Sequence, residues 1–313
     1  MTICINSLAT ASFLYAEPGR TAAQFLVRDT GTRALALGGA FTAAWGDIES
    51  IGYNPAGVGT ITNTQIDLMY SRGFAGDNFG SMNLGLPQLH PVHFGLGATH
   101  YDAGSIDLNL SGGLQEKRKA EQDWAFTGTM ALELTSVVSV GASAKSFRST
   151  LAEEYDAQGT AFDAGLLMRL PLGGRLGHLY AGGSLMNQGD EITFHKEKDP
   201  LPTKRAGGLA WRFGGQSQEG MGDEPGRWEV LMLGDVSQVK HEKKIASLGL
   251  EVTQFNLFGS ETIASLRGGY RSEAQTPSTH VGFGWGQELW LLNYALVFHK
   301  TGLRHQMSMS WKL

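Results

Sequence analysis

Residues 138–145 read VSVGASAK, a run in which apolar residues at even positions alternate with small or polar residues at odd positions. Neighbouring side chains of a β-strand point to opposite faces, so this run predicts a strand with one apolar face and one polar face. The same alternation returns along the chain as far as Leu313. We therefore expect an all-β protein.

Charged residues in the alternating runs fall on the parity opposite the apolar row. In residues 246–253, for example, Leu248 and Leu250 share one face while Glu251 lies on the other. A Lys or Arg that faces lipid at the bilayer midplane costs a membrane barrel about 2–4 kcal/mol, which explains such sorting. A soluble β-sandwich also alternates, but it tolerates charges on its outer face. The pattern favours a transmembrane antiparallel β-barrel over a sandwich.

We expect about 14 strands, an even number that leaves both ends of the chain on the periplasmic side. The predicted ranges are 64–73, 79–86, 91–102, 122–134, 136–148, 158–170, 177–187, 203–213, 227–238, 243–254, 261–271, 278–285, 288–299 and 304–313. Short connections, as at 135–136, are assigned to the periplasm, and the longer polar ones at 103–121, 149–157 and 188–202 to the outside. The Gly-rich linker 214–226 is an exception, because it is long and falls on the periplasmic side.

The polar row of this barrel carries charges of both signs. The charged residues predicted to face the lumen are Glu133, Lys145, Asp163, Arg169, Arg205, Glu229, Asp235, Glu251, Arg267 and Arg271. We favour the interpretation that they form salt bridges between the wall and an internal segment, and a charge-selective path is the alternative. Several of the 43 glycines, such as Gly141, Gly165 and Gly249, also fall on inward positions. Small inward residues are expected to leave room in the lumen.

Composition sets further limits. The net charge of −5 and the lack of a concentrated basic stripe argue against a nucleic-acid partner. The single cysteine, Cys4, excludes an internal disulfide framework and a cysteine metal site. No apolar run of ~18 residues occurs, so the sequence predicts no transmembrane helix. Residues 1–16 end in an apolar stretch before Glu17 and Pro18, which we interpret as the tail of a secretory signal rather than as an unstructured terminus.

One segment near the N-terminus breaks the period of two. Residues 33–45 read RALALGGAFTAAW and look helical, although Gly38 and Gly39 each cost a helix about 1 kcal/mol relative to Ala. Small residues let a helix approach other backbone closely, so we place this helix inside the barrel as a plug rather than on its surface. The predicted domains are a signal remnant at 1–16, a hatch at 17–62 and the β-barrel at 63–313.

The residues around this segment resemble a known family. They read GTRALALGGAF from Gly31, followed by Asp47 and then by NPAG at 54–57. This pattern looks like the N-terminal hatch of the PorV/PorQ family, which belongs to the FadL-like outer-membrane β-barrels. The hatch residues that carry the resemblance are Gly31, Arg33, Gly38, Gly39, Phe41, Asp47, Asn54, Pro55 and Gly57. The resemblance implies a location in the outer membrane of a Gram-negative-type bacterium.

The resemblance also implies one of two non-enzymatic functions. A barrel of PorV type docks exported proteins at the outer membrane, as in type IX secretion, and we favour this hypothesis. The alternative is a FadL-like passive channel for hydrophobic compounds such as long-chain fatty acids. The expected partners are outer-membrane lipid, together with secreted cargo proteins and secretion components or with hydrophobic small molecules.

Catalysis is not expected. His100, Asp102 and Ser105 lie close together at one predicted strand end, but they form no recognisable arrangement of a nucleophile and an orienting base. The sequence predicts no cofactor and no metal site.

Overall fold

The structure of the protein, a computed structural model, describes most of the chain. The described residues are 21–73, 76–89, 91–109, 115–194, 198–216, 227–257, 261–272 and 276–313. The predicted signal remnant at 1–16 and most of the linker predicted at 214–226 lie outside the described residues.

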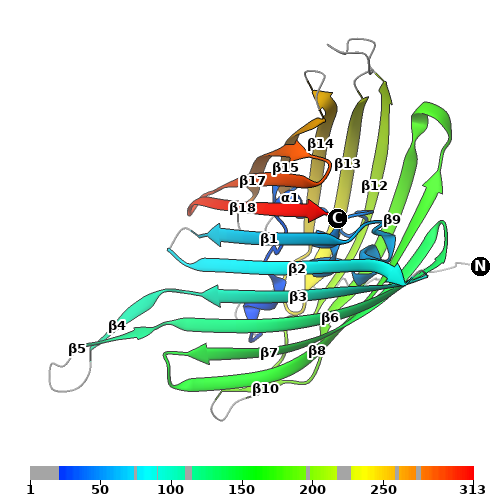
Figure 1. The fold of residues 1–313 in the computed structure, drawn as a ribbon. Coiled ribbons are helices and arrows are strands. Elements are labelled where there is room, and N and C mark those ends of the chain that lie inside the picture. The colour runs from blue at the N-terminus through cyan, green and yellow to red at the C-terminus, as the bar shows by residue number, and fades with distance from the viewer. Residues whose placement is uncertain are drawn as a thin grey trace, which may run out of the picture.

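Fourteen antiparallel strands close into a barrel. They are β1 (Gln65–Arg72), β2 (Asn78–Leu89), β3 (Val92–Asp102), β6 (Glu121–Thr135), β7 (Val138–Leu151), β8 (Tyr155–Pro171), β9 (His178–Gln188), β12 (Lys204–Gln216), β13 (Arg227–Val239), β14 (Ile245–Leu257), β15 (Thr262–Arg271), β16 (Ser278–Gln287), β17 (Trp290–His299) and β18 (Gly302–Lys312). β1 pairs with β18 and so closes the barrel, and Figure 1 shows these two strands side by side in blue and red. The all-β class and the even number of strands are confirmed.

The two ends of the barrel differ in their connections. β1 begins and β18 ends at the same end, which we call the terminal end. The opposite end, which we call the loop end, carries a hairpin of β4 (Ser105–Asn109) and β5 (Gln115–Lys119) that projects away from the barrel in Figure 1. Two short paired strands, β10 (Ile192–Thr193) and β11 (Lys198–Asp199), lie between β9 and β12 in the chain. The loop end is therefore the more elaborated one.

One loop-end connection is shorter than predicted. β7 and β8 continue through most of the stretch assigned to a loop at 149–157, and only residues 152–154 form a turn. The long alternating run of each strand thus extends past the length that a bilayer requires.

The outward face of the barrel is apolar and the inward face is polar. Leu248 and Leu266 are 61% and 72% exposed on the outward face, whereas the inward Glu251 and Arg267 are 3% and 6% exposed. Residues paired across neighbouring strands face the same side of the wall: Leu248 lies opposite Gly234 on the outward face, and Glu251 lies opposite Arg267 on the inward face. This arrangement is the one that a barrel surrounded by hydrocarbon requires.

The prediction that Arg205 faces the lumen is wrong. Arg205 is exposed on the outward parity of β12, in line with Leu209, and lies opposite Gln238 of β13. Lys204 takes the inward position instead, where its ammonium group lies 5.7 Å from the ring centre of Tyr53. Lys204 and Arg205 are adjacent basic residues, and the small residues 206–208 that follow them fit either face of a strand. Residue type alone therefore did not show which of the two basic side chains faces the lumen.

The prediction of one helix over residues 33–45 is also wrong. The only α-helix among the described residues, α1, spans Thr32–Ala36, and it is preceded by a short 3-10 helix at Gln24–Val27. Gly38 and Gly39 follow α1 with φ values of 69° and 75°, a left-handed conformation that a continuing helix cannot contain.

Two further 3-10 helices, η2 (Ile48–Gly52) and η3 (Pro55–Thr60), complete this region. We call residues 21–62 the luminal segment. Across the described residues, no helix combines the length and apolar character needed to cross a membrane.

Candidate functional site

The luminal segment lies inside the barrel, because inward side chains of several separated strands contact it. Asp235 of β13 accepts hydrogen bonds from the backbone amides of Phe41 and Thr42, at 2.9 and 2.8 Å. Ser139 of β7 donates a hydrogen bond of 2.7 Å to the carbonyl of Ala56. Residues of α1 also form a buried apolar cluster with β17. The strands thus surround the segment.

Inward glycines give the luminal segment its space. A side chain on Gly141 would meet the backbone of Pro55 at about 2.5 Å, and one on Gly249 would meet Leu37 at about 2.8 Å. Gly165, Gly269 and Gly282 are similarly close to the segment. The sequence interpretation that small inward residues leave open lumen therefore needs correction, since backbone fills that space.

Asn54 connects the segment both to itself and to the wall. Its side-chain amide donates hydrogen bonds to the carbonyls of Thr42, at 2.8 Å, and of Leu166 on β8, at 3.0 Å. Its side-chain oxygen accepts the backbone amide of Ala56 and so caps η3, in which Pro55 occupies the first turn. Gly57 lies against Ser50, where a side chain would collide. The NPAG sequence therefore has a tertiary role beyond forming a turn.

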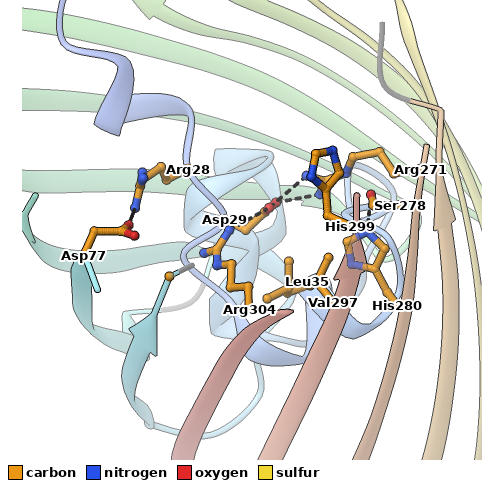
Figure 2. A pocket seen from close by; sticks show the side chains of 11 residues that line it. Arg28, Asp29, Leu35, Asp77, Arg271, Ser278, His280, Val297, His299 and Arg304 are labelled. Atoms are coloured by element: carbon orange, nitrogen blue, oxygen red, sulfur yellow. Dashed lines mark hydrogen bonds and ion pairs between the residues drawn. The ribbon is translucent and has the colours of Figure 1, made fainter. Parts of the chain in front are cut away.

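Near the loop end, a cluster of charges joins the luminal segment to the wall, as Figure 2 shows. Both carboxylate oxygens of Asp29 accept hydrogen bonds from Arg271 of β15, at 2.8 and 2.9 Å, and Arg304 of β18 lies 3.9 Å away. Arg271 also donates to the carbonyl of Gly38 at 2.8 Å. Burial alone would raise the pKa of Asp29, but the positive charges of Arg271 and Arg304 hold it well below its usual range. Asp29 is thus ionised at neutral pH.

A second charged cluster lies on the terminal-end side of α1. Arg33 of the segment contacts Asp47 at 2.8 Å and donates two hydrogen bonds to Glu251 of β14, at 2.5 and 2.8 Å. Glu251 also accepts a hydrogen bond of 2.5 Å from Arg267, which in turn donates to Asn293 at 2.8 Å. These groups form a continuous buried network between the segment, β14, β15 and β17.

Glu49 holds the start of α1. Its two side-chain oxygens accept hydrogen bonds from the backbone amides of Arg33 and Ala34, at 3.1 and 2.9 Å, and so satisfy donors that have no partner within the helix. Gly31 packs against the same side chain. Burial, with the charges of Asp47 and Asp67 nearby, raises the pKa of Glu49 well above its usual value.

The other inward charges predicted from the sequence pair within the wall or meet the segment elsewhere. Lys145 of β7 lies 2.9 Å from Asp163 of β8, and both side chains are buried. Glu229 lies 3.3 Å from Arg212, and Glu133 faces inward opposite Ser139. These ion pairs favour the interpretation that the inward charged residues form salt bridges, rather than a charge-selective path through the lumen.

The aromatic side chain of Trp45 packs the luminal segment against β8 and β9. The guanidinium carbon of Arg169 lies 4.8 Å from the ring centre of Trp45, and the ring centres of Trp45 and Tyr180 lie 5.5 Å apart. Arg212 of β12 donates a hydrogen bond of 3.3 Å to the carbonyl of Trp45. Trp45 is therefore held by three adjacent strands of the wall.

The luminal segment leaves a cavity at each end of the lumen. The loop-end cavity has a volume of about 190 Å³ and is lined by Asp29, Leu35, Arg271 and other residues shown in Figure 2. The terminal-end cavity is larger, about 540 Å³, and its lining includes Arg33 and Trp45. Since Leu35 lines the first and Arg33 the second, α1 lies between the two cavities.

Several contacts of this site were not predicted. Asp29, Trp45 and Tyr180 carried no signal beyond their residue types, because only the folded segment brings them to the wall. Arg304 could have been found, since it shares the inward parity of Gln306 in the last alternating run. Within the described ranges, no group of three or more His, Cys, Asp or Glu residues is arranged to hold a metal ion.

Comparison of the sequence with protein families and with curated proteins finds no match. Solved structures do match. A monoaromatic hydrocarbon channel, CymD, superposes with a TM-score of 0.57 at 12% identity, over 91% of this chain and 97% of that one. The Ralstonia pickettii toluene transporter TbuX superposes with a TM-score of 0.56 at 13% identity, over 92% of this chain and 100% of that one.

A Pseudomonas aeruginosa FadL homologue matches with a TM-score of 0.53 at 10% identity, over 90% of this chain and 98% of that one. At these identities the likeness concerns the fold. The chain therefore shares the barrel fold of these three proteins over nearly its whole length.

Proposed function

We propose that this protein is an outer-membrane channel through which small hydrophobic solutes pass without an energy source, and that the luminal segment acts as its hatch. One observation carries the proposal: the segment divides the lumen into a loop-end cavity and a terminal-end cavity, with α1 between them. A solute can occupy either cavity, but α1 must shift before it moves from one to the other. The loop end faces the outside, because short connections and both barrel termini belong to the periplasm.

The size of the cavities supports small solutes. Ligand pockets usually have volumes of about 300–1,000 Å³, and the terminal-end cavity of about 540 Å³ lies in that range. The loop-end cavity, at about 190 Å³, has room for a single small ring, and its lining combines Leu35 and Val297 with charged side chains such as that of Arg271. The named functions of the similar structures, a monoaromatic hydrocarbon channel and a toluene transporter, point to the same class of solute.

The contacts of the segment support movement rather than permanent closure. Its ion pairs, such as Asp29 with Arg271, join two separate parts of the chain and can separate without breaking strand pairing. The segment contributes no strand to the barrel. A shift of residues 28–47 would therefore leave the barrel intact.

Protein docking, which the sequence resemblance favoured, is the second candidate. The projecting β4–β5 hairpin supports it, since its charged residues include Arg118, which pairs with Glu116 and Glu154 at the loop end. CymD and TbuX, two of the solved structures with this fold, are named as a hydrocarbon channel and a toluene transporter, so the comparisons favour transport.

Uptake by whole cells tests the proposal. Small hydrocarbons cross plain phospholipid vesicles unaided, so the assay uses a Gram-negative host with an intact lipopolysaccharide leaflet and no channel of this kind. We expect cells that produce the protein to take up labelled toluene faster than control cells, with no gain for a labelled sugar. Equal toluene uptake, together with exported proteins that copurify with the barrel and are lost when residues 105–119 are removed, would favour docking instead.

A further inference from the structure

A cavity also lies on the outside of the barrel wall. Its volume is about 620 Å³, and it is open to the surroundings over β9 and β12 to β15. We call it the wall groove and define it by Leu209, Met232, Gly234, Leu248, Leu250 and Gly268. No charged residue lines it.

Missing side chains create the wall groove. Gly234 lies on the outward face of β13, directly between Leu209 of β12 and Leu248 of β14. Gly268 lies on the outward face of β15 opposite Leu250, and no atom lies within 4 Å of where its side chain would begin. The leucines around these glycines stand out from the wall, with Leu209 57% and Leu248 61% exposed. They form the rim of a depression whose floor is backbone.

The floor of the wall groove is closed on the inner side. Gly249 and Gly269, which face inward behind it, pack against Leu37 and Gly38 of the luminal segment. The groove therefore does not open into either lumen cavity, and its occupant must come from the surroundings of the barrel.

The chemistry of the wall groove selects hydrocarbon. Apolar cavities stay dry, because a water molecule inside them lacks hydrogen-bond partners. An unfilled groove would forfeit dispersion contacts on all of its lining atoms. The rim belongs to the same outward apolar face that meets lipid in a membrane barrel, so acyl chains reach the groove without leaving the bilayer.

We propose that the wall groove holds one acyl chain of an outer-membrane lipid in a fixed position. A second copy of the protein is a poorer occupant, because a stable protein interface buries about 800 Å² on each partner and the groove is a single depression across five strands. The inference rests on the membrane location of the barrel and not on solute transport.

Filling the wall groove with protein side chains tests this proposal. The double variant Gly234→Leu, Gly268→Leu places two side chains in it, and both point outward into space that is free or in ordinary contact. Gly128→Leu is the matched control, since Gly128 is also an outward glycine of an exposed strand face with no atom within 4 Å. All variants are first checked for the heat-dependent gel mobility of a folded barrel.

The measurement is electron paramagnetic resonance of a phospholipid that carries a spin label on its acyl chain. The sample is a lipid bilayer into which the purified barrel is reconstituted. We expect the wild type and Gly128→Leu to show a strongly immobilised lipid fraction that the double variant loses. The smaller Gly234→Ala, Gly268→Ala pair is expected to weaken the fraction, and it replaces the leucine pair if that one does not fold.

Three results would overturn the proposal. The first is an equal immobilised fraction in the wild type, the filled variants and the control. The second is a wild-type dimer, seen by light scattering, that the filled variants convert to monomer. The third is displacement of the labelled lipid by toluene at concentrations that leave other boundary lipids unchanged. Failure of toluene uptake in cells would affect the transport proposal alone.

Discussion

The luminal segment is held in two different ways on two sides of the barrel. Toward β13, β14 and β15, charged wall side chains hold it, as when Glu251 binds Arg33 and Asp235 binds the amide of Phe41. Toward β7 and β8, bare wall backbone holds it, because Gly141 and Gly165 let residues 54–56 approach closely. Gly249 and Gly269 pack closely against the segment on the first side too, so the difference lies in charge: residues 54–56 meet β7 and β8 through packing and uncharged hydrogen bonds alone.

The difference shows which contacts can be reversible. An ion pair can separate and re-form while each partner finds water in an adjoining cavity. Residues 54–56 have no ion pair with β7 or β8 to exchange for water, and packed interiors resist small changes of volume. We therefore expect the β13–β15 side to move when the hatch opens and the β7–β8 side to act as its fixed point.

Breaking the charged side should have the largest effect on stability. Glu251→Ala leaves Arg33 and Arg267 buried without their shared partner, and removal of one partner from a buried pair costs about 3–5 kcal/mol. The measurement is the free energy of unfolding in denaturant, in lipid or detergent. Asp156→Ala is the matched control, because it breaks an exposed pair with Arg148 and should cost about 1 kcal/mol or less. Equal losses for the two variants would contradict the buried network.

Filling the glycine side should have an intermediate effect. Gly141→Leu forces a side chain against Pro55, and overpacking of this kind typically costs about 1–3 kcal/mol. We also expect protease to cut near residues 54–57 in the variant, because the segment can no longer seat against β7. Gly128→Leu should change neither the stability nor the cutting pattern. A protected segment in Gly141→Leu would show that this contact is not the fixed point.

Protonating Asp29 should loosen the segment only in acid. The pKa of Asp29 is held below its usual value of about 3.9, so its contribution to stability is complete above that pH and is lost as pH falls toward the lower, folded value. We therefore expect Asp29→Asn to be less stable than the wild type from pH 7 to about pH 5, and the gap to shrink below about pH 4. A gap that stays constant through the acid range would contradict the ion pair as its cause.

The smallest effect is expected at Arg205. Because this residue is exposed on the outward parity and not in the lumen, Arg205→Ala should change the free energy of unfolding by no more than about 0.5 kcal/mol. Lys145→Ala, at a buried inward position paired with Asp163, should destabilise the barrel clearly more. A similar loss of unfolding free energy in both variants would indicate that Arg205 faces the lumen after all.

The barrel could be predicted because its strands repeat one local rule. Alternation fixed the faces of Leu248 and Glu251 without any knowledge of their partners, and tertiary structure agrees with it. The rule failed at Arg205, where small neighbours carry no parity signal. It is weakest where glycine is most frequent.

The luminal segment was harder to predict because its conformation depends on the wall. Residues 33–45 have helix-forming composition, but the turn at Gly38 and Gly39 is set by contacts with Arg271 and with the backbone of Tyr270. Arg33 and Glu251 were each identified as candidates, yet nothing in the sequence joined residues so far apart in the chain. Pairing across that distance is a property of the closed barrel.

The most direct test of the account fixes the luminal segment to the wall reversibly. The variant Leu37→Cys, Gly249→Cys, made in a Cys4→Ser background, places one cysteine on the segment and one on β14, on the side that is expected to move. The Cβ of Leu37 lies about 2.8 Å from where a side chain on Gly249 would begin, so a shift of about 1 Å reaches disulfide geometry. The measurement is toluene uptake by cells before and after reduction of this bond. We predict that the oxidised barrel adds no uptake above cells that lack the protein, and that reduction restores it. Uptake by the oxidised barrel at the reduced rate would contradict a hatch that must move.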